Sequence, residues 1–301
     1  MNTSVKTKPT SNWLGYAGLY AELTKLRISV MVLFTFAVTG VLSAGLSVDL
    51  WTLLYASVGM MLIAASGNAM NMYLERYTDL LMPRTANRPL PAEKLSSTEV
   101  VVFAAICLGV SLGIFCTLVN WQTALCGFAT WFLYVWIYTP LKVRTPLNTE
   151  IGAVAGALPI LMGALATTGT VGWIGWSFFI VLLIWQFPHF MAIAWIYRKQ
   201  YGNGGLKMLT VVDPSGHKAG RKAIVTCIAL VVASLLPAAI LPSAIHMIVF
   251  SILALVIGGY YLKASIEFAQ DRNDTSARRL LKSSILYLPM YMLIVVVSSL
   301  V

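Results

Sequence analysis

The fold of this chain is decided by residues 98–139, TEVVVFAAICLGVSLGIFCTLVNWQTALCGFATWFLYVWIYT, in which Glu99 is the single charged residue. A helix needs about 20 mostly apolar residues to cross a lipid bilayer. The stretch is therefore long enough for two spans, 98–119 and 121–139. Because the link at Asn120–Trp121 is so short, the two helices must run antiparallel.

The rest of the chain has the same character. Of its 301 residues, 58% are hydrophobic and 11% are charged, whereas a soluble domain carries about 25% charged residues. No soluble fold of this length buries so much apolar surface, so lipid is the remaining solvent. We predict an all-α polytopic membrane protein, a bundle of about nine transmembrane helices in a single domain over residues 1–301. The predicted spans are 28–46, 52–74, 98–119, 121–139, 150–168, 174–196, 223–241, 243–262 and 283–301.

The basic residues indicate on which side of the membrane each loop lies. If the N-terminus is cytoplasmic, all 21 Lys and Arg residues fall in cytoplasmic segments, and Asp49 is the one charge on the other side. This asymmetry follows the positive-inside rule. We therefore expect the N-terminus, with its polar segment 1–20, in the cytoplasm and the C-terminus on the opposite side. The cytoplasmic segments are 1–27, 75–97, 140–149, 197–222 and 263–282.

The asymmetry also accounts for the net charge of +10. Lys and Arg hold cytoplasmic loops beside the membrane, so membrane lipid is an expected partner and nucleic acid is not. The first twelve residues lack the apolar core of a signal peptide and the Arg-rich pattern of a transit peptide. A bacterial cytoplasmic (inner) membrane is thus favoured over an organelle.

A polar stripe leaves the membrane with the second span. Asn71, Glu75 and Asp79 are spaced i, i+4 and i+8, which places them on one face of a helix. Two like charges at a membrane boundary repel each other and lose hydration, and a bound cation would reverse both costs. Oxygen ligands of this kind suit Mg²⁺, which bridges carboxylates to phosphate oxygens. A solvated helix end with ordinary interfacial charges is the alternative, and Asn68 inside the apolar span argues against it.

Arginines follow the stripe at once, at Arg76, Arg84 and Arg88. Arginine is well suited to phosphate and carboxylate groups. Acidic and basic residues at one helix end are therefore consistent with a site for a Mg²⁺-diphosphate.

Two further cytoplasmic segments carry candidate anion-binding residues. Lys142 and Arg144, between the fourth and fifth spans, would contact a diphosphate or a ligand carboxylate, or they anchor the loop. Arg198 begins the basic, glycine-containing loop 197–222, which could cap a site or contact lipid headgroups. Gly152 and Gly156 have the small-xxx-small spacing of close helix packing.

His189 lies inside the sixth span, in the sequence WQFPHF at 185–190. A buried histidine is often a hydrogen-bonded core residue, but its position within the membrane raises the expectation of a function. It could bind an aromatic or metal-containing ligand, or transfer a proton.

Three blocks of the sequence resemble the UbiA superfamily of intramembrane prenyltransferases, and within it the branch that farnesylates haem. The first is the stripe from Asn71 to Asp79 followed by PRTANRPL at 83–90. The others are YTPLKVRTPLN at 138–148, and WQFPHF at 185–190 with KMLTVV at 207–212. The similarity extends from about residue 22 to the C-terminus.

The resemblance implies a helix bundle with a central cavity that opens near the cytoplasmic side. It also implies transfer of a farnesyl group from farnesyl diphosphate to a vinyl group of haem b, with Mg²⁺ as cofactor. On this reading Asn71, Glu75 and Asp79 hold the Mg²⁺-diphosphate, and His189 lies near the haem. The basic residues implied to neutralise diphosphate or haem propionates are Arg76, Arg84, Arg88, Lys142, Arg144 and Arg198. Haem A synthase or the terminal oxidase assembly machinery would be protein partners.

This sequence departs from the family pattern at two positions. The family usually has Asp where this chain has Glu75, and many relatives have an acid where it has Gln200. A second acidic motif is therefore absent, and we expect one Mg²⁺ site. The alternatives are prenylation of a quinone precursor or another aromatic or tetrapyrrole acceptor, a haem-binding protein without catalysis, and a membrane transporter. The absence of the second motif disfavours the quinone enzyme, and polar groups on one side alone disfavour the transporter.

Overall fold

The computed structural model describes residues 13–300, and every regular element in this range is a helix. Nine helical segments of the described range are long and apolar enough to cross a membrane, and each contains most of one predicted span. The prediction of an all-α polytopic membrane protein is confirmed. Residues 1–12 of the predicted polar segment and Val301 lie outside the described residues, while Trp13–Leu23 forms a helix.

The α-helices of the described chain, in order, are α1 (Trp13–Leu23), α2 (Leu26–Ala44), α3 (Leu50–Leu80), α4 (Ser97–Ile114), α5 (Trp121–Phe132), α6 (Thr139–Leu141), α7 (Asn148–Thr168), α8 (Trp173–Ile196), α9 (Arg198–Asn203), α10 (Leu209–Val212), α11 (His217–Ala233), α12 (Ala244–Asp271) and α13 (Asp274–Leu300). Short 3₁₀ helices follow α2 and α11 at Gly45–Ser47 and Leu236–Ile240. Wider π-helical turns extend α4 and α5 over Phe115–Val119 and Leu133–Tyr138.

Several helices are longer than hydropathy predicts. Hydropathy predicts that the second span ends at 74, but α3 continues to Leu80. It predicts that the last span begins at 283, but α13 begins at Asp274. Hydropathy marks the apolar part of a helix, whereas backbone hydrogen bonds continue into the polar residues beyond it. As a result, Glu75 and Asp79 stand on regular helix.

Side chains of the connecting residues fix where these helices begin. Asp49 accepts hydrogen bonds from the backbone N–H groups of Trp51 and Thr52 at the start of α3. Ser96 and Glu99 form a capping box at the start of α4, and Asn120 caps α5 through Thr123. Each cap satisfies backbone donors that the first helical turn leaves unpaired.

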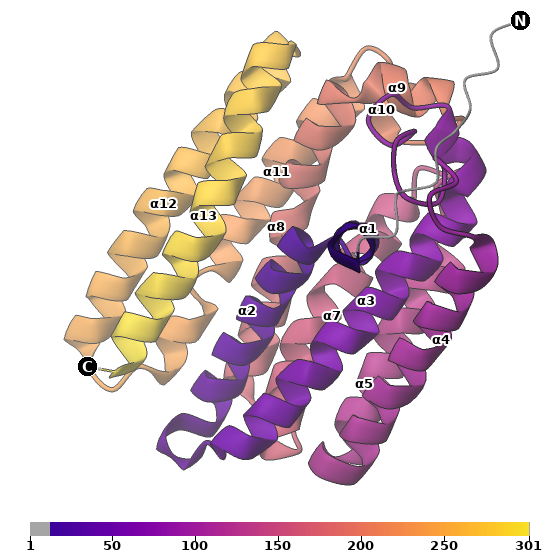
Figure 1. The fold of residues 1–301 in the computed structure, drawn as a ribbon. Helices are drawn as coiled ribbons and strands as arrows, with labels where there is room; N and C mark the ends of the chain where they lie inside the picture. Colours follow the sequence, from indigo (N-terminus) through magenta and orange to yellow (C-terminus); the bar gives the residue numbers. More distant parts are fainter. Residues whose placement is uncertain (1–12, 301) are drawn as a thin grey trace, which may run out of the picture.

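The bundle has two outer groups of helices joined by a central one (Figure 1). α3, α4 and α5 lie on one side, α11, α12 and α13 on the other, and α2, α7 and α8 between them. Residues 81–96 and the short helices α9 and α10 gather at one end of the bundle, and α13 ends at the opposite end. Polar loops of distant sequence therefore meet at one end.

Glycines allow close contact between the central helices. A Cβ on Gly163 of α7 would overlap the carbonyl oxygen of Phe36 in α2. Gly152 and Gly156 lie against Tyr138 and Gln186, in agreement with the predicted packing role. Small residues at such positions let helix backbones approach within a membrane.

Gly163→Ala should lower the stability of the protein by about 1–3 kcal/mol, because the added methyl group forces α2 and α7 apart. Gly113→Ala in α4 is the matched control, since no atom beyond its own helical turns lies within 4 Å of the added Cβ. That control should be neutral or slightly stabilising. Thermal unfolding of both variants in one detergent is the measurement, and an equal melting temperature for the two would contradict the contact.

Candidate functional site

A small polar pocket opens where the loops gather. Its cavity volume is about 100 Å³, whereas pockets that hold drug-sized ligands are about 300–1,000 Å³. It therefore has room for a charged headgroup and not for a whole lipid or cofactor. The lining residues are Lys25, Asn71, Glu75, Asp79, Met82, Arg84, Thr85, Arg88, Tyr138, Lys142, Tyr201, Leu206 and Met208.

The predicted stripe of α3 forms one wall of this pocket. Asn71 is fully buried and Asp79 is 1% exposed, while the Glu75 side chain is 12% exposed. All three side chains line the same cavity. The i, i+4, i+8 spacing therefore brings them together on one face of α3.

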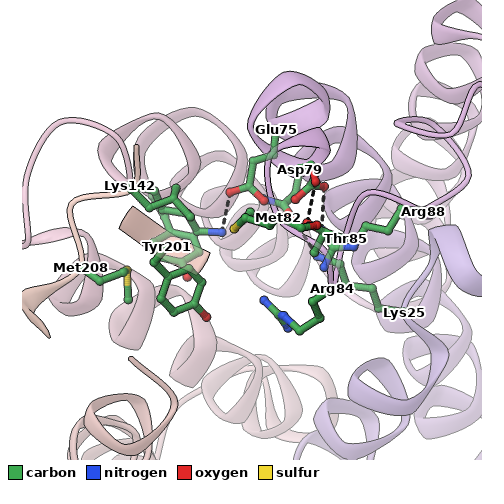
Figure 2. A pocket seen from close by; sticks show the side chains of 13 residues that line it. Lys25, Glu75, Asp79, Met82, Arg84, Thr85, Arg88, Lys142, Tyr201 and Met208 are labelled. Atoms are coloured by element: carbon green, nitrogen blue, oxygen red, sulfur yellow. Dashed lines mark hydrogen bonds and ion pairs between the residues drawn. The ribbon is translucent and has the colours of Figure 1, made fainter. Parts of the chain in front are cut away.

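Both carboxylates of the wall form ion pairs with other segments. Lys142 Nζ lies 2.6 Å from Glu75 Oε1, and Arg88 Nη1 lies 2.7 Å from Asp79 Oδ2. Figure 2 shows these two contacts beside each other on α3. Burying a carboxylate without a partner is costly. The two ion pairs therefore explain how Glu75 and Asp79 can be buried in this wall.

Asn71 is bonded to a residue that the sequence did not single out. Lys25 Nζ donates to Asn71 Oδ1 over 2.7 Å, and Asn71 Nδ2 donates to Thr139 Oγ1 over 3.1 Å. Lys25 resembles an ordinary basic anchor in front of an apolar span. No sequence signal marked it as part of a site.

The break between α1 and α2 places Lys25 in the pocket. Lys25 has a φ of +50°, a left-handed conformation that non-glycine residues seldom adopt. Asn68 of α3 supports the break, because its Nδ2 donates to the carbonyl oxygen of Thr24 over 2.8 Å and to Ser29 Oγ over 3.2 Å. Asn68 thus has a positioning role beside the stripe.

The turn after α3 brings two arginines back toward the wall. Thr85 Oγ1 donates to the carbonyl oxygen of Asp79 over 2.9 Å and so fixes the turn. Arg88 then reaches Asp79. The Arg84 guanidinium lies over the ring of Tyr197 at 4.7 Å and points toward the open middle of the pocket (Figure 2).

The remaining wall comes from the fourth span and from the segment after α8. The Lys142 ammonium lies 4.5 Å from the centre of the Tyr138 ring. The carbonyl oxygen of Lys142 accepts a hydrogen bond of 2.6 Å from the backbone N–H of Lys207. This bond holds the α9–α10 segment, with Tyr201 and Met208, against the pocket.

The pKa values of the two pocket lysines, Lys25 and Lys142, shift in opposite directions. Burial lowers the pKa of the Lys25 ammonium to about 7, and the positive charges of Arg88 and Lys142 act in the same direction. Burial alone would also lower the pKa of Lys142, but Glu75 outweighs it and raises that pKa. Burial raises the pKa of the Tyr201 hydroxyl, so this group stays protonated at neutral pH.

Four other predicted residues do not line the pocket. Arg76 lies against the rings of Tyr73 and Tyr77, at 4.4 and 4.3 Å. Arg144 is exposed, and Arg198 Nη1 pairs with Asp274 Oδ1 at 2.7 Å.

His189 is the fourth of these residues and lies within the bundle. Its Nδ1 is 2.7 Å from Ser284 Oγ of α13. Its ring stacks on Trp185 with 4.8 Å between the ring centres. The side chain is partly buried.

The oxygen donors of α3 fit Mg²⁺ only in part. Two carboxylates and an amide oxygen are hard ligands, but Mg²⁺ prefers octahedral coordination that water and phosphate usually complete. Among the described residues, no group of three or more His, Cys, Asp and Glu side chains is arranged to hold a metal ion. The pocket therefore suits a metal ion that shares phosphate oxygens, and not an ion held by protein alone.

The fold and the pocket together define a class: a polytopic helical membrane protein with a headgroup-sized pocket, lined by acidic and basic side chains, at one end of its bundle. Comparison with known proteins agrees. The family model described as the UbiA prenyltransferase family matches residues 31–293. The chain belongs to the UbiA prenyltransferase family.

Curated relatives cover nearly the whole chain. A protoheme IX farnesyltransferase of Rhodopirellula baltica is 38% identical over 91% of this chain and 97% of its own length. One of Opitutus terrae is 40% identical over 95% of both chains. A mitochondrial protoheme IX farnesyltransferase of Arabidopsis thaliana is 34% identical over 92% of this chain and 64% of its own length.

Solved structures share the fold at low sequence identity. A digeranylgeranylglyceryl phosphate synthase superposes with a TM-score of 0.78 at 18% identity, over 94% of this chain and 98% of the other. A UbiA homologue of Archaeoglobus fulgidus, bound to GPP and Mg²⁺, gives 0.67 at 15% identity, over 92% and 99% of the two chains.

Arg88→Met should lower the stability of the protein by about 3 kcal/mol, because it leaves the buried Asp79 carboxylate without its partner. Arg84→Met is the matched control in the same turn, since Arg84 has no carboxylate partner among the described residues. We expect a clearly lower melting temperature for Arg88→Met alone. Equal melting temperatures would contradict the assigned pairing.

Proposed function

We propose that this chain transfers the farnesyl group of farnesyl diphosphate to a vinyl group of haem b. The observation that carries the proposal is the convergence of the α3 oxygen donors and four basic side chains on one headgroup-sized pocket. The curated relatives named protoheme IX farnesyltransferase support haem b as the acceptor and farnesyl diphosphate as the farnesyl donor. The Mg²⁺-bound structural relative supports a divalent metal.

In this proposal Asn71, Glu75 and Asp79 hold Mg²⁺, which when bound supplies Lewis-acid stabilisation to the leaving diphosphate. Arg84, Arg88 and Lys142 bind the diphosphate oxygens through charge-assisted hydrogen bonds. Their fixed positive charges stabilise the negative charge that develops as the allylic C–O bond breaks.

The reaction couples this bond cleavage to attack by the acceptor. The allylic C–O electron pair leaves with the diphosphate, and the haem vinyl group attacks the farnesyl carbon. Water adds to the resulting cation and loses a proton, which yields a hydroxyethylfarnesyl side chain. Because the pocket holds only the headgroup, the farnesyl chain extends among the transmembrane helices, where water is scarce.

The haem would lie nearer to the middle of the bundle. We assign His189 to its surroundings, since this side chain is a polar group within the apolar span and lies outside the diphosphate pocket. Arg76, Arg144 and Arg198 remain candidates for the haem propionates.

The cellular setting is part of the proposal. The chain would lie in a bacterial inner membrane, and the charge asymmetry of its loops supports an N-terminus in the cytoplasm. Residues 1–301 act as a single domain, and the product would pass to haem A synthase or to the oxidase assembly machinery.

The function is tested by incubating the purified protein in detergent with haem b, farnesyl diphosphate and Mg²⁺. Mass spectrometry should detect haem whose mass has increased by one farnesyl group and one hydroxyl group, because a vinyl group has become a hydroxyethylfarnesyl group. A quinone precursor offered in place of haem should give no product. Absence of haem product while a haem-farnesylating relative is active under the same conditions, or prenylation of the quinone precursor alone, contradicts the proposal.

Asp79→Asn should reduce turnover by about 100-fold or more while the protein stays folded, because a metal ligand and a charge are lost. Chelation of divalent ions should abolish wild-type turnover, and added Mg²⁺ should restore it. Asp213→Asn, in the loop before α11, is the control and should keep wild-type rates. Wild-type turnover in Asp79→Asn would remove the metal-site assignment.

His189→Phe should reduce transfer to haem by about tenfold or more and alter the haem absorption spectrum of the complex. Phenylalanine can still stack on Trp185. His246→Phe is the matched control, because His246 contacts Ser243 at the start of α12 and not Ser284 or Trp185. Unchanged spectra and rates in His189→Phe would exclude a role for this residue at the haem.

A further inference from the structure

All three oxygen donors of α3 are bonded to basic side chains of the protein. Asn71 Oδ1 accepts from Lys25, Glu75 pairs with Lys142, and Asp79 pairs with Arg88. A metal ion needs lone pairs on these same side chains. Metal binding must therefore compete with the protein's own cations.

The charge of the pocket favours an anion over a cation. Four basic side chains line it, Lys25, Arg84, Arg88 and Lys142, against the two acidic side chains Glu75 and Asp79. Positive groups still outnumber negative ones if Lys25 is left out. A bare divalent cation is repelled by this surplus, whereas a multiply charged diphosphate is attracted.

Two of the four basic groups lack a carboxylate partner among the described residues. Arg84 lies over the Tyr197 ring, and Lys25 is bonded to the neutral amide of Asn71. A partly buried cation whose direct partner is neutral has lost hydration, and no negative charge compensates for that loss. Lys25 and Arg84 therefore offer charge to an anion at no cost to an existing ion pair.

The backbone conformation of Lys25 also supports a role for this residue in binding an anion. Its left-handed conformation carries a conformational cost, and Asn68 holds the break through two hydrogen bonds. Such strain is kept where the surrounding structure fixes it, often at binding sites. Here the left-handed conformation directs the Lys25 ammonium toward Asn71 of α3.

We propose that Lys25 is a further diphosphate-binding residue, and that the pocket takes up the diphosphate before or together with the divalent metal and not the metal alone. This rests on the proposed function. The diphosphate oxygens draw Lys25, Lys142 and Arg88 away from α3. Asn71, Glu75 and Asp79 are then free to hold the metal that the diphosphate brings.

The binding order is tested with Mn²⁺, followed by electron paramagnetic resonance, and with farnesyl thiolodiphosphate, whose C–S bond resists ionisation. The wild-type protein in detergent should show no saturable Mn²⁺ binding alone. It should bind the analogue without metal, as measured by calorimetry, and bind Mn²⁺ saturably once the analogue is present.

The role of Lys25 is tested in the same assay. Lys25→Met should weaken metal-free analogue binding by about tenfold or more, the effect of one charge-assisted hydrogen bond. Lys25→Arg should restore most of it. Lys94→Met, on the loop before α4 and outside this pocket, is the matched control and should bind as wild type.

The outcomes separate the two proposals. Mn²⁺ binding to the wild type that is equally tight with and without the analogue overturns the binding order. Unchanged analogue affinity in Lys25→Met overturns the assignment of Lys25. If the wild-type protein binds no analogue under any condition, the proposed function fails together with this inference.

Discussion

Two carboxylates held inside the protein at the end of α3 are the constraint on which the site depends. Asp79 is almost completely buried and Glu75 nearly so, and a buried carboxylate must be paired or neutralised. Arg88 comes from the turn after α3 and Lys142 from the end of the fourth span. The need to pair these acids therefore ties three separate segments into one pocket.

Much of this arrangement could be predicted from sequence because it depends on local properties. The nine spans follow from runs of apolar residues, and the stripe of Asn71, Glu75 and Asp79 follows from helical periodicity. Helical periodicity also separates Arg76 from this stripe. Arg76 comes directly after Glu75, and neighbouring helical residues do not share a face, so its side chain points away from the stripe.

Other features of the site depend on tertiary structure and had no local signal. Lys25 enters the pocket because the chain turns through a left-handed residue between α1 and α2, where Asn68 of a different helix supports it. Arg84 and Arg88 are alike in sequence, yet one pairs with Asp79 and the other lies over Tyr197. Helix ends differ from the predicted ends for a related reason, since hydropathy reports the membrane boundary and not the end of the hydrogen-bonded helix.

On the proposed mechanism, the cations that pair with the α3 side chains are also the groups that bind the diphosphate, so little new structure would have to form. Chemistry at the allylic carbon would then take place at the border between this charged pocket and the apolar interior of the bundle, where the farnesyl chain and the haem would meet.

The most direct measurement is an experimental structure of the protein with Mn²⁺ and farnesyl thiolodiphosphate, with the metal located by its anomalous scattering. We expect Mn²⁺ between the side chains of Glu75 and Asp79 and the diphosphate oxygens, with Lys142 and Arg88 turned to the diphosphate. A metal ion elsewhere, or both carboxylates still paired with Lys142 and Arg88 beside a bound diphosphate, would contradict the account.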